Sequence, residues 1–410
     1  AGTYGLDQCF DLAQSALERG NGVDAPTGPE WKVGEGVAAA MIATIPPRGH
    51  FADASVTLGL DGVYTLNFGT AEFGNGTTTV HSQIAAEALG TSPELLRIHQ
   101  SDTDAVAYDT GAFGSAGTVV AGRAVFAAAT ALALKLTAVA ESLTGVPAGE
   151  WMLEPTGLRA GPRFLPLTEV AAAGASVAAS APTLAADTPT VTITSTLGTP
   201  ASSAPVATAD PAEPAELAGV TLVQTVEGAA TARPVTDGIT ADGRHAGDHR
   251  SIAFNVQAFR VAVNTNTGEV RILQSVQAAD AGFVMNPEQC RGQIEGGVAQ
   301  GIGTSMYEEI IVSDTGEVTT SVLRSYHLPQ MADVPPTEIF FTETADDLGP
   351  YGAKSMSESP FNPVAPALAN AIRRAIGVRP YELPLSRDRI WRLLQPVDAV
   401  PIAARVEAAD

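Results

Sequence analysis

Cysteine is almost missing from this chain of 410 residues, since Cys9 and Cys290 are its only two and lie far apart. A disulfide framework and a cysteine-ligated iron–sulfur cluster within the chain are therefore excluded. Histidine is scarce as well, with 6 residues, and the pair His245 and His249 is separated by Gly247 in a predicted loop. That pair favours solvated side chains over a zinc site. We expect two buried thiols, a cytoplasmic location and no metal held directly by side chains.

Basic residues and long apolar runs are also in short supply. The 23 Lys and Arg residues stand against 45 Asp and Glu, which gives a formal net charge of −22. Such a field repels phosphate backbones and anionic lipids, so nucleic acid and membrane surfaces are poor partners. The longest apolar run, 124–134, is too short to cross a bilayer. No signal peptide is visible, and the start at Ala1 suggests a processed, split or truncated larger polypeptide.

Elements of the same kind occur in the same order at two places along the chain. Residues 54–60 and 63–68 predict a hairpin around Asp61-Gly62, followed by a glycine-rich loop at 73–76 and a helix at 78–89. A second hairpin is predicted from 259–264 and 269–276, and the glycine-rich helical stretch 292–303 follows it. We therefore expect an α+β fold with two lobes of similar build, 1–160 and 248–410.

The stretch 161–247 between these lobes has a different composition. No Lys or Arg occurs between Arg163 and Arg233, and 171–216 is dominated by Ala, Pro, Ser and Thr. Such a stretch buries little, so we expect a linker or a surface excursion. Further helices are predicted at 119–143, at 364–376 and after Ser386, which suits an N-cap.

Four segments combine small residues with amide or carboxylate side chains: 69–76, 102–118, 292–303 and 349–360. Glycines before a helix let backbone N–H groups approach an anion, and the helix dipole favours it. The amides of Asn75 and Gln293 can grip the edge of a heterocycle. Glu358, with Lys354 one turn back, suits a general base. Taken singly, each glycine stretch also fits a tight turn, and Glu358 also fits a helix-capping or salt-bridged carboxylate.

Taken together, the order and spacing of these segments over most of 1–160 and 248–395 resemble one family. The matching stretches are 72–76 with the helix after it, 102–118, 267–271, 286–303, 307–309 and 352–358. They are similar to the C-terminal half of the molybdopterin-binding subunit of the molybdenum hydroxylases, the family of xanthine dehydrogenase and aldehyde oxidase. The resemblance implies a two-lobed fold around an elongated molybdopterin with molybdenum, carried as the cytosine dinucleotide.

The resemblance also implies roles for particular residues. Glu358 would be the catalytic base that takes a proton as oxygen attacks an electron-poor carbon beside the molybdenum. Gln293 would hydrogen-bond the cofactor, and Asn75, between Gly74 and Gly76, stands where the family has glutamine. The pterin would be wrapped mainly by backbone, a role that small residues permit. The wrapping residues would be Phe113, Gly114, Ser115, Ala116, Gly117 and Thr118.

Two residues beside Glu358 depart from the family pattern. Ser357 stands where glycine is usual, and Ser359 stands where proline is common. Because the carboxylate itself is kept, these departures indicate a subfamily rather than a lapsed enzyme.

Other parts of the family's enzymes have no counterpart in this sequence. The resemblance therefore implies three partners: the other half of the Mo-binding subunit, an iron–sulfur subunit with [2Fe–2S] clusters and an FAD subunit. The implied reaction is oxidative hydroxylation of a small molecule with water as oxygen donor. We favour an N-heteroaromatic or purine-like substrate. An aldehyde-oxidising member, a catalytically lapsed cofactor-binding subunit and a non-enzymatic ligand-binding protein stay open as alternatives.

Overall fold

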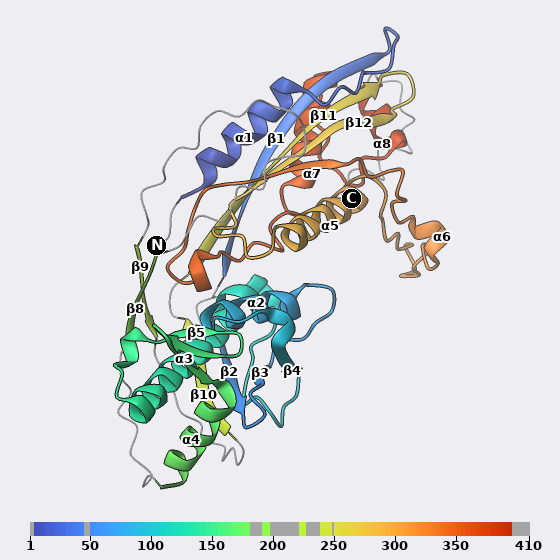
Figure 1. Cartoon of the computed structure of the whole chain (residues 1–410). Coiled ribbons are helices and arrows are strands. Elements are labelled where there is room, and N and C mark those ends of the chain that lie inside the picture. The colour runs from blue at the N-terminus through green and yellow to red at the C-terminus, as the bar shows by residue number, and fades with distance from the viewer. Residues whose placement is uncertain are drawn as a thin grey trace.

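The computed structural model describes residues 4–44, 50–180, 191–196, 221–226, 238–247 and 250–395. Two four-stranded sheets form the bases of two lobes, which lie end to end (Figure 1). We name them the β11 lobe, with strand order β1-β11-β12-β13, and the β2 lobe, with strand order β10-β2-β3-β4. The predicted α+β class and two-lobed build are confirmed.

The β11 lobe contains β1 (Trp31–Thr44), β11 (Ser251–Asn264), β12 (Val270–Ala279), β13 (Thr337–Phe341), α1 (Leu6–Arg19), α5 (Pro287–Met306), α6 (Leu323–Tyr326), α7 (Val364–Ile376) and α8 (Arg387–Leu394). The β2 lobe contains β2 (His50–Gly59), β3 (Tyr64–Phe68), β4 (Leu96–Gln100), β10 (Gly238–Gly247), α2 (Thr77–Ala88), α3 (Gly122–Thr144) and α4 (Leu167–Ser180). Two small sheets complete the description: β5 (Met152–Glu154), β6 (Gly157–Ala160) and β7 (Arg163–Pro166), and β8 (Val191–Thr196) with β9 (Thr221–Val226).

The same series of elements builds both lobes. In the β2 lobe the antiparallel hairpin β2-β3 leads through α2 into β4, which is parallel to β3. In the β11 lobe the antiparallel pair β11-β12 leads through α5 into β13, which is parallel to β12. The predicted repetition of a hairpin followed by a helix is therefore confirmed. Each lobe adds the parallel return strand.

The two lobes exchange their edge strands. The strand β1 precedes β2 in the chain but pairs with β11, and β10 precedes β11 but pairs with β2. The predicted ranges 1–160, 161–247 and 248–410 therefore do not coincide with the lobes: α1 and β1 belong to the β11 lobe, and β10 is a sheet strand within the predicted excursion. Residues 171–180 continue the helix α4 rather than a linker. The Gly- and Ala-rich sequences of β1 and β10 lack the β-branched runs that mark a strand.

Glycines let a helix pack directly on each exchanged strand. A Cβ atom at Gly36 of β1 would lie 2.1 Å from the Ala371 nitrogen of α7. A Cβ atom at Gly243 of β10 would lie 2.2 Å from the Ala124 oxygen of α3. No side chain fits at either position, so backbone meets backbone and each strand is held against its helix.

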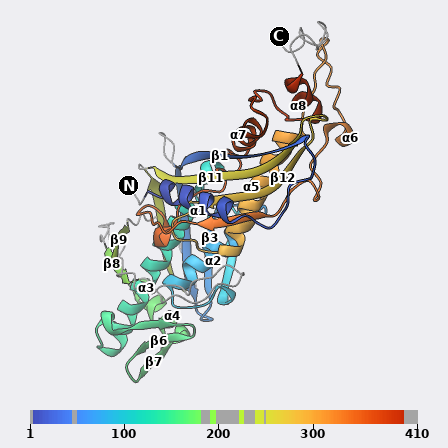
Figure 2. The same cartoon turned by 90° about the horizontal axis from the view of Figure 1, so that it is seen from above.

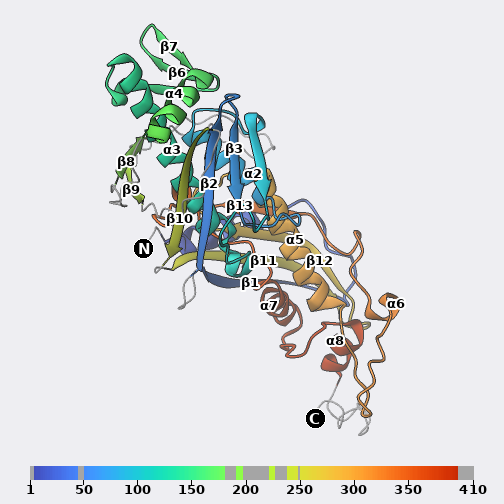
Figure 3. The ribbon, with the colours of Figure 1, turned by 90° about the horizontal axis from the view of Figure 1, so that it is seen from below.

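Helices cover both faces of the β11 sheet. The helix α1 packs on one face around Cys9, Val256 and Val276 (Figure 2). The helices α5 and α7 pack on the opposite face, with Phe259 at the centre of the core (Figure 3). Strand β2 alternates buried and half-buried residues, because the helices α2 and α3 cover only one face of its sheet.

The residues 117–144 form the one helix of the described chain whose length and mean hydropathy, 1.7, would allow it to cross a membrane. Of its most apolar stretch, 72% is buried inside the protein. Ala124, Ala128 and Leu132 are fully buried against the β2 sheet. This helix is therefore the core helix of the β2 lobe.

Candidate functional site

A cavity of about 440 Å³ opens where the two lobes meet. Four segments line it: the loop before α2, the turn at 112–118, the start of α5 with the residues before it, and the stretch 353–358. Each contains part of a segment predicted from the sequence. Residues as far apart in the sequence as Phe73 and Glu358, which are 285 positions apart, line the same cavity because the two lobes meet there.

Glu358 and Ser115 join the two lobes at the mouth of this cavity. The Ser115 hydroxyl donates to Glu358 Oε2 at 3.2 Å, and the Glu358 backbone N–H donates to Ser115 Oγ at 3.0 Å. Ser115 is buried with a left-handed φ of 56°, while Glu358 is exposed to the solvent in the cavity mouth. A non-glycine residue seldom adopts this backbone conformation, so the turn is strained where it meets the carboxylate.

The glycine loop before α2 meets α5 across the cavity. Gln293 Nε2 donates to the Gly74 carbonyl at 3.3 Å. Gly76 has a φ of 77°, and a Cβ atom there would lie 2.7 Å from Gln289 Oε1. Asn75 faces the cavity, and its Oδ1 accepts from the Thr77 hydroxyl at 3.1 Å. The loop therefore needs glycine for its left-handed backbone conformation, and the end of the Gln289 side chain occupies the space beside Gly76.

The Glu72 carboxylate stabilises this loop through hydrogen bonds to its backbone. Its carboxylate accepts hydrogen bonds from the backbone N–H groups of Gly74, Gly76 and Thr78, at 2.8, 3.2 and 3.0 Å. Burial raises the pKa of Glu72, but these backbone donors outweigh it, so that the pKa is lowered from its usual value. An ionised Glu72 thus fixes the loop that presents Asn75.

The turn at 113–118 leads into a short π-helix, Gly117–Ala121, before α3 begins. Gly117 and Thr118 face the cavity at its first turn. The Gly117 carbonyl accepts the backbone N–H of Gly122 and contacts His81 Nε2 at 3.2 Å. Single π-turns are common at functional sites, because the widened turn redirects side chains and backbone groups.

The structure gathers most of the predicted site residues. Those that line the cavity are Asn75, Ser115, Gly117, Thr118, Gln293 and Glu358. Gly74 and Gly76 flank Asn75 in the loop. Gly114 is the middle residue of the turn Phe113–Ser115 and does not line the cavity. Its carbonyl accepts from the Thr44 hydroxyl at 2.7 Å. Ala116 is buried in the core of the β2 lobe rather than facing the cavity.

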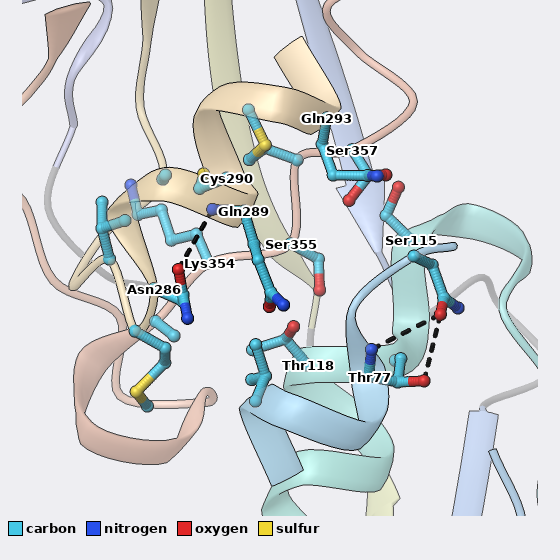
Figure 4. Close-up of a pocket in the computed structure, with 18 of the residues that line it drawn as sticks. Thr77, Ser115, Thr118, Asn286, Gln289, Cys290, Gln293, Lys354, Ser355 and Ser357 are labelled. Carbon is cyan, nitrogen blue, oxygen red and sulfur yellow. Dashed lines mark hydrogen bonds between the residues drawn. The ribbon is translucent and has the colours of Figure 1, made fainter. Parts of the chain in front are cut away.

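Among the cavity residues that the sequence did not single out, two have a buried polar atom without a hydrogen bond to the described protein. These atoms are Gln289 Oε1 and Ser355 Oγ. Gln289, Ser355 and Thr118 point toward one another across the space between α5 and the π-turn (Figure 4). Gln289 stands four residues before Gln293 on α5, a spacing that places both on one face of the helix and could have identified it.

Lys354 forms an ion pair with Asp280 and not with Glu358, the carboxylate one turn further along the chain. Its Nζ lies 2.8 Å from Asp280 Oδ2, and both side chains are almost fully buried. Asp280, directly after β12, also accepts from the Thr344 hydroxyl at 2.6 Å. The lysine therefore anchors the Glu358 segment to β12, and the carboxylate of Glu358 turns instead to Ser115.

Comparison with known proteins identifies the family. The model of the molybdopterin cofactor-binding domain matches residues 12–335. The chain is 29% identical over 374 residues to the probable hypoxanthine oxidase XdhD of Escherichia coli (strain K12), covering 91% of this chain and 33% of that protein. It is 29% identical over 376 residues to the 6-hydroxypseudooxynicotine dehydrogenase complex subunit gamma of Paenarthrobacter nicotinovorans, covering 89% of this chain and 40% of that protein.

The fold is that of a solved relative. Quinoline 2-oxidoreductase from Pseudomonas putida 86 matches with a TM-score of 0.69 and 23% identity, over 96% of this chain and 44% of that one. The chain spans a third to two fifths of the length of the two relatives above. The predicted family is confirmed: the chain belongs to the molybdopterin cofactor-binding domain family, as found in the Mo-binding subunits of the molybdenum hydroxylases.

Proposed function

We propose that this chain is the cofactor-binding, catalytic part of a molybdenum hydroxylase that hydroxylates an electron-poor carbon with water as oxygen donor. The observation that carries the proposal is the hydrogen-bonded pair of Glu358 and Ser115 at the mouth of a cavity lined by Gln293. A carboxylate in this place is oriented by the opposite lobe and faces an open volume, as a general base requires.

The cavity residues fit a molybdopterin. The unpartnered Gln289 Oε1 and Ser355 Oγ, together with the amides of Asn75 and Gln293, offer donors and acceptors for the edge of a pterin. Backbone N–H groups at the first turn of the π-helix, Gly117–Ala121, suit its anionic groups. When bound, the molybdenum cofactor would supply oxygen-transfer and two-electron redox chemistry. We extend the proposal to the cytosine dinucleotide form.

The chemistry of the chain's own residues centres on Glu358. The Ser115 hydroxyl binds Oε2, and Oε1 receives no hydrogen bond from the described residues. Oε1 would accept the proton from the oxygen nucleophile, and Ser115 would keep the carboxylate turned toward it. Because a single hydroxyl holds the carboxylate, small errors in its placement would be costly for the rate.

The assembly around the chain is part of the proposal. Its relatives are two to three times longer than the matched part, which supports a further Mo-binding half that would close the cavity mouth over Glu358. We further propose that electrons leave through [2Fe–2S] and FAD subunits, and that the assembly works in the cytoplasm. The name of one relative, a probable hypoxanthine oxidase, favours a purine-like or N-heteroaromatic substrate.

The decisive test is Glu358→Gln in the assembly purified from its host. Turnover of N-heteroaromatic substrates should fall by at least about 10³-fold, because the amide cannot accept the proton. Molybdenum content, measured by mass spectrometry, should stay unchanged. The matched control is Glu295→Gln, an exposed carboxylate on α5 that does not line the cavity.

Four outcomes would contradict the proposal or part of it. Full activity of Glu358→Gln would remove the base, and a wild-type assembly without molybdenum would favour a ligand-binding protein. A wild type that binds molybdenum but turns over no substrate would indicate a lapsed subunit. Turnover of aldehydes alone, in a panel of both substrate classes, would replace the proposed substrate with an aldehyde.

A further inference from the structure

A patch of polar side chains is buried in the middle of the β11-β12 sheet. Asn255, Gln257, Ser275 and Gln277 are at most 1% exposed, and Gln257 lies directly opposite Gln277 in the strand register. The rest of this face, which packs against α5 and α7, is apolar. Burying amides in an apolar layer costs free energy unless they form hydrogen bonds, so their contacts indicate what they are for.

Two of these amides bind the residues directly after Glu358. Gln277 Nε2 donates to the Pro360 carbonyl at 2.8 Å. Asn255 Nδ2 donates to the Ser359 hydroxyl, which in turn donates to the Met356 carbonyl at 2.8 Å. Ser359 is itself fully buried. Proline has no side-chain group that could accept one hydrogen bond and donate the next, so the departure from proline at this position has a structural use.

The N-terminal end of the segment, at Lys354, is bound to the residues that directly follow β12. Besides the Lys354–Asp280 ion pair, the Lys354 backbone N–H donates to the Ala281 carbonyl at 2.9 Å. The stretch 354–360 is thus fastened at both ends to β12 and its neighbour. Between the two anchors, Ser357 and Glu358 face the solvent.

We propose that Asn255 and Gln277 are positioning residues that hold the 354–360 segment so that Glu358 meets Ser115. This inference rests on the proposed role of Glu358. Neither amide lines the cavity, so both act through the segment and not on the substrate. A rigid sheet fixes the anchors, and a carboxylate on a loop reaches its productive position only if such a support exists.

The test compares Gln277→Met with a matched control, Gln274→Met, in the purified assembly. Gln274 lies on the same strand and is equally buried, but its amide donates to the Ala16 carbonyl at 3.0 Å and to Glu338 at 2.7 Å, beneath α1. Both variants lose a buried amide of the same size. Only Gln277→Met loosens the Glu358 segment.

Two readouts are measured for each variant: amide hydrogen exchange of the peptide spanning 354–360, and kcat and KM separately. We expect Gln277→Met to speed exchange of the Glu358 N–H about tenfold and to lower kcat about tenfold with KM within twofold, because only the orientation of the base changes. Gln274→Met should change neither. Ser359→Ala, which removes a single hydroxyl, should move both readouts in the same direction, even if Gln277→Met fails to fold.

Equal exchange and equal kcat in Gln277→Met, Ser359→Ala and the Gln274→Met control would overturn the inference. Failure of the proposed function looks different. If Glu358→Gln keeps full turnover while Gln277→Met still speeds exchange of the segment, the anchoring stands and the identity of the base is wrong.

Discussion

At the scale of single residues, the site depends on atoms that meet only after the lobes assemble. Ser115 contributes one hydroxyl that both accepts from the Glu358 N–H and donates to its carboxylate. Its left-handed backbone turns the hydroxyl out of the β2 lobe toward the β11 lobe. Backbone strain of this kind persists only where surrounding contacts stabilise it. At Ser115 the two hydrogen bonds to Glu358 do so.

A buried histidine supports the same turn and makes stability depend on pH. His81 is fully buried, with its ring edge-on to Phe68 at 4.7 Å and Nε2 against the Gly117 carbonyl. Burial lowers the pKa of His81 from 6.5 to about 4. The unfolded chain therefore binds more protons between these values, and the stability that His81 contributes is complete above pH 6.5 and is lost as the pH falls toward 4.

We expect His81→Asn to flatten the pH dependence of stability. Between pH 7 and pH 4 the wild type should lose about 3 kcal/mol more unfolding free energy than the variant, because only the wild type carries the shifted group. Urea denaturation at a series of pH values measures this. His327→Asn, at an exposed histidine, is the control and should keep the wild-type slope. Parallel curves for His81→Asn and wild type would contradict the assignment.

The sequence predicted those site residues whose segments carry a glycine pattern. Asn75, Gln293 and Glu358 stand in such segments, and all three line the cavity. Ser355 lies in such a segment and Gln289 is four residues from Gln293, but what marks both is an unpartnered atom that only the folded cavity shows. The Asp280 partner of Lys354 was missed because 74 residues separate the two, and no local pattern reports such a contact.

At the scale of elements, local patterns predicted helices and hairpins well. The helix α7 begins and ends at the predicted residues, Val364 and Ile376, and α8 begins after Ser386, whose side chain accepts from the Arg389 N–H. Strands β1 and β10 were not predicted. Their small Gly and Ala residues allow close contact with α7 and α3. This packing in the folded protein, and not a local preference for strand, makes these residues β-strands.

The glycine contacts predict a sharp difference between two substitutions. Gly36→Ala should lower the unfolding free energy by about 1–3 kcal/mol. The added Cβ would lie 2.1 Å from the Ala371 nitrogen, and the backbone of α7 would have to shift to make room for it. Gly149→Ala, where a Cβ meets nothing within 4 Å, should stay within about 0.5 kcal/mol of wild type. Chemical denaturation of both variants measures the difference, and equal stabilities would refute the close packing of α7 on β1.

At the scale of the whole molecule, the exchanged strands tie the lobes together and fix the cavity between them. The chain passes from β1 into β2 and returns from β10 into β11, so each lobe contains a strand from the other's part of the sequence. Moving one lobe away from the other would pull on both exchanged strands at once. The cavity walls are thereby set in place before any ligand arrives, which lowers the entropy that binding must overcome.

A ligand that fills this cavity should therefore stabilise both lobes at once. We expect the assembly from cells unable to make the pterin cofactor to unfold several °C below the loaded form, because a ligand that binds only the folded state adds to its stability. Hydrogen exchange should be faster in the cofactor-free form at 74–78 of the β2 lobe and at 289–293 of the β11 lobe. The sheet β5-β6-β7 has no residue in the cavity wall, so its peptides serve as the internal control. If only one of the two lobes responded, the cofactor would lie within that lobe and not between them.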